Sequence, residues 1–223
     1  MLLNNRFLII LSLIIFFSCD SNKSEDGYKN GVVVSAKIEA SQAGISILKQ
    51  GGNAFDAMIA TDLALSVVYP NAGNLGGGGF MIYRLSDHST GSLDFREKSP
   101  SLSTKDMYLD KEGNEIKGLS INGSLAIGIP GTVAGLFEVY DKFGTLPLET
   151  LFAPAIELAE KGFILTKRQA NSLNFSKGQI NSINDSLSLF NKHFKEGDLF
   201  INKSLSNSLK LILKNGRDEF YQG

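Results

Sequence analysis

Apolar and polar residues follow one another with helical spacing in several stretches of the chain. The segment from Glu39 to Lys49 has an apolar inner face, and Gly51 follows it where a left-handed residue can end a helix. The segment from Ala54 to Val68 is apolar on nearly every side, which is typical of a helix that other elements cover. Asn53 is a suitable N-cap for this second helix, and Asp56 is expected to cap or pair near its start.

The second half of the chain also predicts helices. They span Thr132 to Lys142, Leu148 to Lys161 and Leu205 to Lys214, each closed by a nearby glycine. Pro154 should bend the middle one, because proline removes a backbone donor from the helix interior. Residues 101–126 have a mixed composition that predicts no regular element with any strength.

Strand-like spacing appears in three places. Gly31 to Ser35 is a short β-branched run that predicts a buried strand, whereas Phe80 to Leu85 and Ser92 to Phe95 flank a polar turn and predict a hairpin. Because these strands come as a pair rather than one per helix, we expect an α/β layered fold with antiparallel pairs, not a simple parallel doubly wound sheet.

The amino-terminal residues have the pattern of an export signal. Arg6 precedes an almost wholly apolar run from Phe7 to Phe17, which is shorter than the roughly 20 residues of a membrane-spanning helix. Ser18 and Cys19 follow, and Cys19 is the single cysteine of the chain, with no intrachain disulfide partner. A small residue before a cysteine at this point is similar to a bacterial lipoprotein processing site.

We therefore expect residues 1–18 to be a signal peptide, Cys19 to be lipidated, and residues 19–30 to be a flexible polar tether. The alternative is a plain cleaved signal with a leftover cysteine. Either processing predicts export, and lipidation predicts a protein anchored in the bacterial cell envelope, at the periplasmic or outer-membrane face. The folded domain would then comprise residues 31–223.

Composition narrows the partners. With 22 Lys+Arg against 23 Asp+Glu the net charge is -1, and no basic stripe stands out, so nucleic acid is not an expected partner. His88 and His193 have no cluster of cysteines or carboxylates around them, which argues against a metal site.

The glycine run from Gly76 to Gly79 lacks the lysine and the following helix of a phosphate loop. A tight connection between a helix and a strand is one interpretation of this run, and we favour the other, a close approach of backbone to a substrate or to another segment.

Several short motifs are spread over residues 31–223. They are Gly51-Gly-Asn-Ala-Phe-Asp-Ala57, Gly76-Gly-Gly-Gly-Phe-Met81, Leu93-Asp-Phe-Arg-Glu97, Gly128-Ile-Pro-Gly-Thr-Val-Ala-Gly-Leu136, Ala153-Pro-Ala-Ile-Glu-Leu-Ala159 with Gly162-Phe163, and Phe220-Tyr-Gln-Gly223. In this order and spacing the chain resembles the γ-glutamyltransferase family. Two positions depart from the family pattern: Ala36 to Glu39 lacks a common histidine, and Phe55 replaces a smaller aliphatic residue.

The resemblance implies an N-terminal-nucleophile hydrolase fold, a four-layer α-β-β-α sandwich of which this chain would be an incomplete part. In that family a precursor cuts itself, and the threonine exposed at the start of the small chain becomes the nucleophile. No threonine here has the expected setting, so the resemblance implies that the nucleophile lies beyond residue 223. We expect the chain alone to have no transferase activity.

The implied reaction is transfer of a γ-glutamyl group from glutathione or a related donor to water, an amino acid or a peptide, with no cofactor. Arg96 matches the family arginine that grips the α-carboxylate of the donor, a task that suits the guanidinium fork. Glu97 is a candidate to orient Arg96. From the residues alone, Arg96 paired with Asp94 or Glu97 on the surface is the more ordinary interpretation, and the motif match reverses that preference.

Two other functions stay open at this point. One is a related acylase for glutaryl-β-lactams or an amidase for γ-linked polymers, which would share the fold but not the donor. The other is a non-catalytic envelope lipoprotein. The intact Leu-Asp-Phe-Arg-Glu motif around Arg96 favours the γ-glutamyltransferase.

Overall fold

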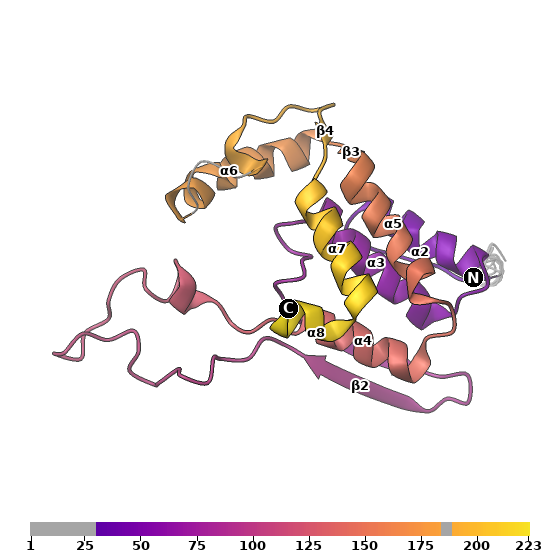
Figure 1. The fold of residues 1–223 in the computed structure, drawn as a ribbon, viewed down its shortest axis with the longest axis horizontal. Coiled ribbons are helices and arrows are strands. Elements are labelled where there is room, and N and C mark those ends of the chain that lie inside the picture. Colours follow the sequence, from indigo (N-terminus) through magenta and orange to yellow (C-terminus); the bar gives the residue numbers. More distant parts are fainter. Residues whose placement is uncertain (1–29, 184–188) are drawn as a thin grey trace, which may run out of the picture. The chain divides into compact units, whose positions relative to one another are not determined.

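The computed structural model describes residues 30–183 and 189–223, so the predicted signal peptide and Cys19 lie outside the described residues. Figure 1 shows the arrangement of the elements. In chain order they are α2 (Ile38–Lys49), α3 (Ala54–Val68), β1 (Gly79–Arg84), β2 (Thr90–Phe95), η1 (Ser124–Ala126), α4 (Thr132–Phe143), α5 (Leu148–Lys161), β3 (Phe163–Ile164), α6 (Lys167–Ile183), η2 (Leu189–Asn191), β4 (Leu199–Phe200), α7 (Lys203–Asn215) and α8 (Arg217–Gln222). Within the described residues no helix is long and apolar enough to cross a membrane.

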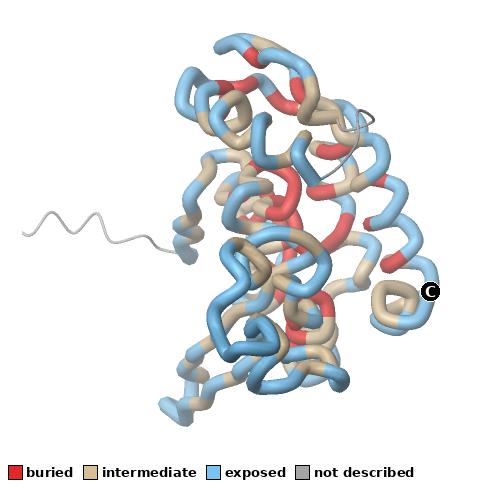
Figure 2. The backbone as a smooth tube through the Cα atoms, turned by 90° about the vertical axis from the view of Figure 1, so that its left-hand side faces the viewer, coloured by how far each residue is buried: buried red, intermediate tan, exposed pale blue. Residues whose placement is uncertain are grey.

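Helix α3 lies at the centre of the packing, as its apolar composition predicts. It contacts α2, α4 and α5, and residues on most of its circumference are buried. Figure 1 shows α7 beside α5 and β2 beside α4, so the outer elements cover this central helix from several sides. In Figure 2 the buried positions gather in the interior of the helical part.

The predicted hairpin is confirmed, with β1 and β2 pairing antiparallel from Gly79 opposite Phe95 to Arg84 opposite Thr90. Its two faces differ. Met81 and Tyr83 on the inner face are half-buried, whereas Phe80 and Ile82 on the outer face are 65% and 87% exposed. The period-2 alternation of a strand accounts for this split.

An aromatic cluster joins the inner face of the hairpin to the helices. The rings of Phe55 and Phe143 stack with centroids 4.2 Å apart, and Tyr83 meets both rings edge-on. Phe55 is the residue at which the chain departs from the pattern of the family that it resembles. Here its ring fills the space between α3, α4 and β1, which accounts for the larger side chain.

The prediction of a strand at Gly31–Ser35 is wrong. These residues form no strand, because a strand needs a hydrogen-bonding neighbour and no other described residue pairs with them. Val33 packs against the core, but Val34 is 85% exposed. The β-branched run is therefore an extended lead into α2 rather than a buried strand.

Several elements were not predicted. Helix α6 has a weak sequence signal, because its sequence is mostly polar and only Gln169 and Ala170 are buried along it. The pair β3–β4 consists of two residues per strand, too few for any alternation to show. Helix α8, which contains the final Phe-Tyr-Gln motif, was also missed.

The α/β class with antiparallel pairs is confirmed. The described residues form two separate two-stranded sheets, β1–β2 and β3–β4, surrounded by helices. They do not contain the large facing sheets of a complete sandwich, in keeping with the expected partial α-β-β-α architecture.

Candidate functional site

Arg96 is the first residue after β2, and the structure leaves its side chain largely free. The backbone N–H of Arg96 donates to Asp94 Oδ1 at 3.0 Å, so Asp94 fixes the main chain rather than the guanidinium. Nε lies 3.9 Å from Glu97 Oε2, at the outer limit of an ion pair, and the side chain is 64% exposed. The guanidinium carbon lies 5.6 Å from the centre of the Phe80 ring. Most donors of the Arg96 fork are therefore available to a ligand.

Glycine backbone surrounds the segment that carries Arg96. A Cβ added at Gly78 would lie 2.6 Å from the carbonyl oxygen of Phe95 and 2.9 Å from the Cα of Arg96. A Cβ added at Gly131 would overlap the carbonyl oxygen of Phe95. Of the two interpretations of the glycine run, close approach to another segment of the chain is therefore correct, and side chains at these positions would displace Arg96.

Hydrogen bonds join the glycine run to the start of α4. The carbonyl oxygen of Gly77 accepts from the N–H groups of Gly131 at 2.8 Å and Thr132 at 3.0 Å. Lys98 and Ile129 exchange two backbone hydrogen bonds of 3.0 and 2.7 Å just beyond Arg96. The glycine run and the residue Lys98, just after Arg96, are thus both hydrogen-bonded to the segment that leads into α4.

Tyr221, on α8, anchors the same loop. Its hydroxyl donates to the carbonyl oxygen of Pro130 at 2.8 Å and accepts from the N–H of Ala134 at 3.2 Å. Ala134 lies in the first turn of α4, where N–H groups have no partner within the helix. The sequence signal for this anchor was the Phe220-Tyr motif, to which no role could be given without the fold.

A cleft of about 580 Å³ opens beside these residues, between the end of β2, helix α4 and helix α8. Cationic and anionic side chains both line this cleft. The cations are Arg96, Lys98 and Arg217, and the anions are Asp94, Glu138 and Asp141. A cleft with both charges can receive a zwitterionic ligand, and Arg96 is the cation with the most complete supporting framework.

Asp56 has the structural role that the sequence predicts. Asn53 Oδ1 accepts from the N–H groups of Phe55 and Asp56, and Asp56 Oδ2 accepts from the N–H of Asn53 at 3.0 Å, which completes a capping box. Asp56 also accepts from the N–H of Thr145 at 3.0 Å and from its hydroxyl. Burial alone would raise the pKa of this carboxyl, but the hydrogen bonds from Thr145 and the backbone outweigh burial, so the pKa lies below its ordinary value.

The remaining candidates lie apart from Arg96. His88 occupies the hairpin turn and its Nδ1 is 2.8 Å from Arg84 Nη2, and His193 belongs to the segment before β4. The described ranges contain no group of three His, Cys, Asp or Glu side chains that could hold a metal ion. Of the predicted site residues, the structure thus places Arg96 and Glu97 together, while Cys19 is outside the described residues.

Comparisons with known proteins identify the family of this chain. The sequence model of the family Gamma-glutamyltranspeptidase matches residues 40–223. The chain is 44% identical over 220 residues to a glutathione hydrolase proenzyme of Pseudomonas sp. (strain A14), covering 96% of this chain and 38% of that protein. It is also 44% identical over 199 residues to the glutathione hydrolase proenzyme of Escherichia coli (strain K12), covering 87% of this chain and 34% of that protein.

A solved structure gives the same result. The γ-glutamyltranspeptidase of Helicobacter pylori matches with a TM-score of 0.85 and 43% identity, covering 88% of this chain and 58% of that chain. The fold of the chain is thus that of an N-terminal-nucleophile hydrolase. Within that class, the chain belongs to the γ-glutamyltransferase family. It spans between a third and two fifths of the length of these curated relatives.

Proposed function

We propose that this chain forms the front part of the large chain of a γ-glutamyltransferase and glutathione hydrolase. In the whole enzyme a threonine of the small chain, made from the same precursor, attacks the γ-glutamyl carbonyl of glutathione or a related donor. The threonine hydroxyl gives its proton to the free α-amine of the same residue, the amide C–N bond breaks, and the leaving amine takes the proton. Water, an amino acid or a peptide then releases the acyl group. This chemistry needs no cofactor.

The observation that supports the proposal is the state of Arg96. Its guanidinium is exposed, has one distant ionic contact to a described residue, and stands on a backbone held by glycine packing and hydrogen bonds. A free fork on a fixed backbone suits bidentate binding of a donor α-carboxylate. The alternative of a surface ion pair with Glu97 is weak, because 3.9 Å is long for such a pair and both groups are exposed.

The test uses protein made from a complete precursor and three p-nitroanilide donors: γ-glutamyl, glutaryl without the α-amine, and 4-aminobutyryl without the α-carboxylate. Arg96→Lys should lower kcat/KM for the γ-glutamyl donor by about 30- to 160-fold, since a charged bidentate contact contributes about 2 to 3 kcal/mol. The same change should barely affect the 4-aminobutyryl donor, which has no carboxylate to lose.

The matched control is Arg84→Lys, an exposed arginine of the same hairpin that lies next to His88 in the turn region. It should leave all three rates unchanged. Self-cleavage of the precursor should proceed in both variants, because the donor carboxylate takes no part in that step. Equal losses for the γ-glutamyl and 4-aminobutyryl donors would remove Arg96 from carboxylate binding. A preference for the glutaryl donor in the unmodified enzyme would favour the related acylase instead.

We also propose that the protein is exported and anchored at the bacterial cell envelope through a lipid on Cys19. This rests on the apolar run from Phe7 to Phe17 and on the single cysteine that follows it. Labelling with an alkyne fatty acid in the native host should mark the protein, and Cys19→Ser should abolish the label and move the enzyme from the membrane to the soluble fraction. An unlabelled protein in the membrane fraction would contradict the anchor.

A further inference from the structure

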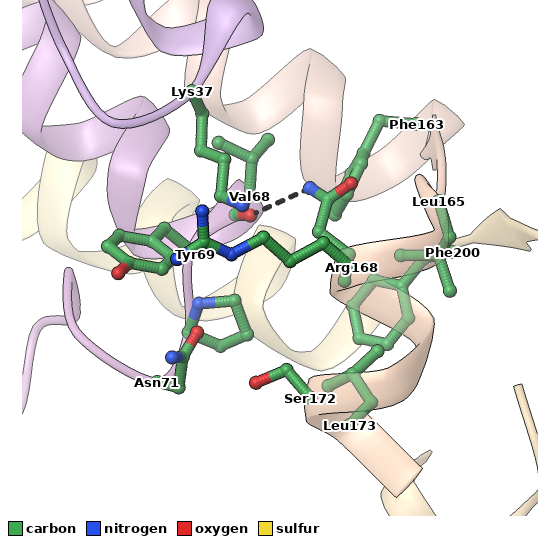
Figure 3. Close-up of a pocket in the computed structure, with 12 residues that line it drawn as sticks. Lys37, Val68, Tyr69, Asn71, Phe163, Leu165, Arg168, Ser172, Leu173 and Phe200 are labelled. Atoms are coloured by element: carbon green, nitrogen blue, oxygen red, sulfur yellow. Dashed lines mark hydrogen bonds between the residues drawn. The ribbon is translucent and has the colours of Figure 1, made fainter. Parts of the chain in front are cut away.

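A small cavity of about 120 Å³ lies where the residues before α2, the end of α3, the start of α6 and the short strands β3 and β4 meet. Figure 3 shows the Lys37 and Arg168 side chains converging beside Tyr69. Gln169 fixes the junction, because its side-chain amide donates to the carbonyl oxygen of Val68 at 3.3 Å. The cavity is not lined by Arg96 or any other residue of the cleft described above.

Among the described residues that line this cavity, there is no carboxylate beside the two cations. Lys37 Nζ lies 4.8 Å from the centre of the Tyr69 ring, and neither Lys37 nor Arg168 forms an ion pair with any other described residue. Burial and the charge of Arg168 lower the pKa of Lys37, and they outweigh the opposite effect of Glu39. Two like charges this close repel each other, and an anion bound between them would add an attraction to each cation that offsets the repulsion.

Neutral polar groups complete the lining. The side chains of Asn71 and Ser172 border the cavity, and in the described part of the chain neither makes a hydrogen bond to another residue. The apolar floor is formed by Val68, Phe163, Leu165, Leu173 and Phe200. The cavity volume of about 120 Å³ is larger than a single water needs and leaves room for a carboxylate or phosphate group.

We propose that Lys37 and Arg168, with Asn71 and Ser172, bind a small oxyanion, a carboxylate or a phosphate group, at this junction. The site is independent of the donor site proposed around Arg96. An anion held here would link α6 to the end of α3. Helix α6 buries only Gln169 and Ala170 along its length, so it gains more from such a link than the well-packed helices do.

The experiment measures the thermal midpoint of the purified full-length protein against sodium phosphate and against sodium acetate, with ionic strength held constant by sodium chloride. We expect a saturable rise with an apparent Kd on the order of 1 mM for at least one of the two anions. Lys37→Met and Arg168→Gln should each weaken this Kd at least tenfold. Lys167→Met, an exposed lysine next to Arg168 on α6, is the matched control and should bind as the unmodified protein does.

A second arm identifies the source of the anion. If a carboxylate of the protein itself fills the site, added anions will have no effect, and carbodiimide treatment will join Lys37 to an acidic side chain, which peptide mass spectrometry can locate. A saturable anion response or this cross-link supports the proposal. A midpoint that rises equally in all variants, or that fails to respond while no cross-link forms, overturns it.

Discussion

Replacing Asp56 with alanine is the sharpest test of how the framework is held together. The carboxylate is 0% exposed and accepts hydrogen bonds from the N–H groups of Asn53 and Thr145 and from the Thr145 hydroxyl. Each hydrogen bond to a charged acceptor contributes about 1.5 kcal/mol net, and alanine leaves three donors without this partner. Asn53 Oδ1 still caps Phe55, which limits the damage at the helix start. We therefore expect the free energy of unfolding to fall by about 3 to 5 kcal/mol.

Urea unfolding followed by circular dichroism measures this loss, and a cycle with Thr145→Val isolates the part carried by the Asp56–Thr145 pair. Asp87→Ala is a matched control, because Asp87 also accepts from a backbone N–H and a hydroxyl, both of Ser89, but in an exposed turn. Its loss should be much smaller. If Asp56→Ala cost no more than Asp87→Ala, burial would not be what makes this carboxylate important, and the reasoning would fail.

Two further predictions concern pH and the glycine packing. Because the folded-state pKa of Asp56 is lowered, its contribution to stability is fully present above the unfolded-state pKa of about 3.9 and is lost as pH falls through the folded-state pKa. The unmodified protein should therefore lose more stability in acid than Asp56→Ala does. Identical acid unfolding curves of the two proteins would contradict this. Gly131→Ala should displace the end of β2 and lower donor kcat/KM by about tenfold or more in the whole enzyme, because its Cβ would overlap Phe95. Gly178→Ala, where an added Cβ meets nothing within 4 Å, should have no such effect, and equal activity of the two variants would argue against the packing account.

The elements with a clear local signal could be predicted from the sequence. Helix α3 was recognised by its apolar composition and by Asn53, and the hairpin by the polar turn between two apolar runs. The run at Gly31–Ser35 was misinterpreted because its β-branched residues are typical of a strand, whereas no described residue pairs with it. Helix α6 has no apolar stripe, so its burial depends on contacts that no local pattern reveals.

The candidate site, too, could be predicted from the sequence only in part. Arg96 was recognised because it belongs to a short motif, and the capping role of Asp56 follows from its place three residues after Asn53. The contacts that fix Arg96 could not be predicted, because Gly77, Gly131 and Tyr221 are far apart in the sequence and meet only in the fold. The glycine run indicated a close approach of backbone, and the structure shows that Gly78 approaches the backbone of Phe95 and Arg96.

The hydroxyl of Tyr221 has a consequence for biosynthesis. Tyr221 reaches back to Pro130 and Ala134, residues that leave the ribosome long before it does. The helices and the hairpin can form as they emerge, but the start of α4 acquires its last anchor only after Tyr221 has been translated. A nascent chain arrested before that point should carry Arg96 on a loosely held loop, because the start of α4 then lacks the hydrogen bonds from Tyr221.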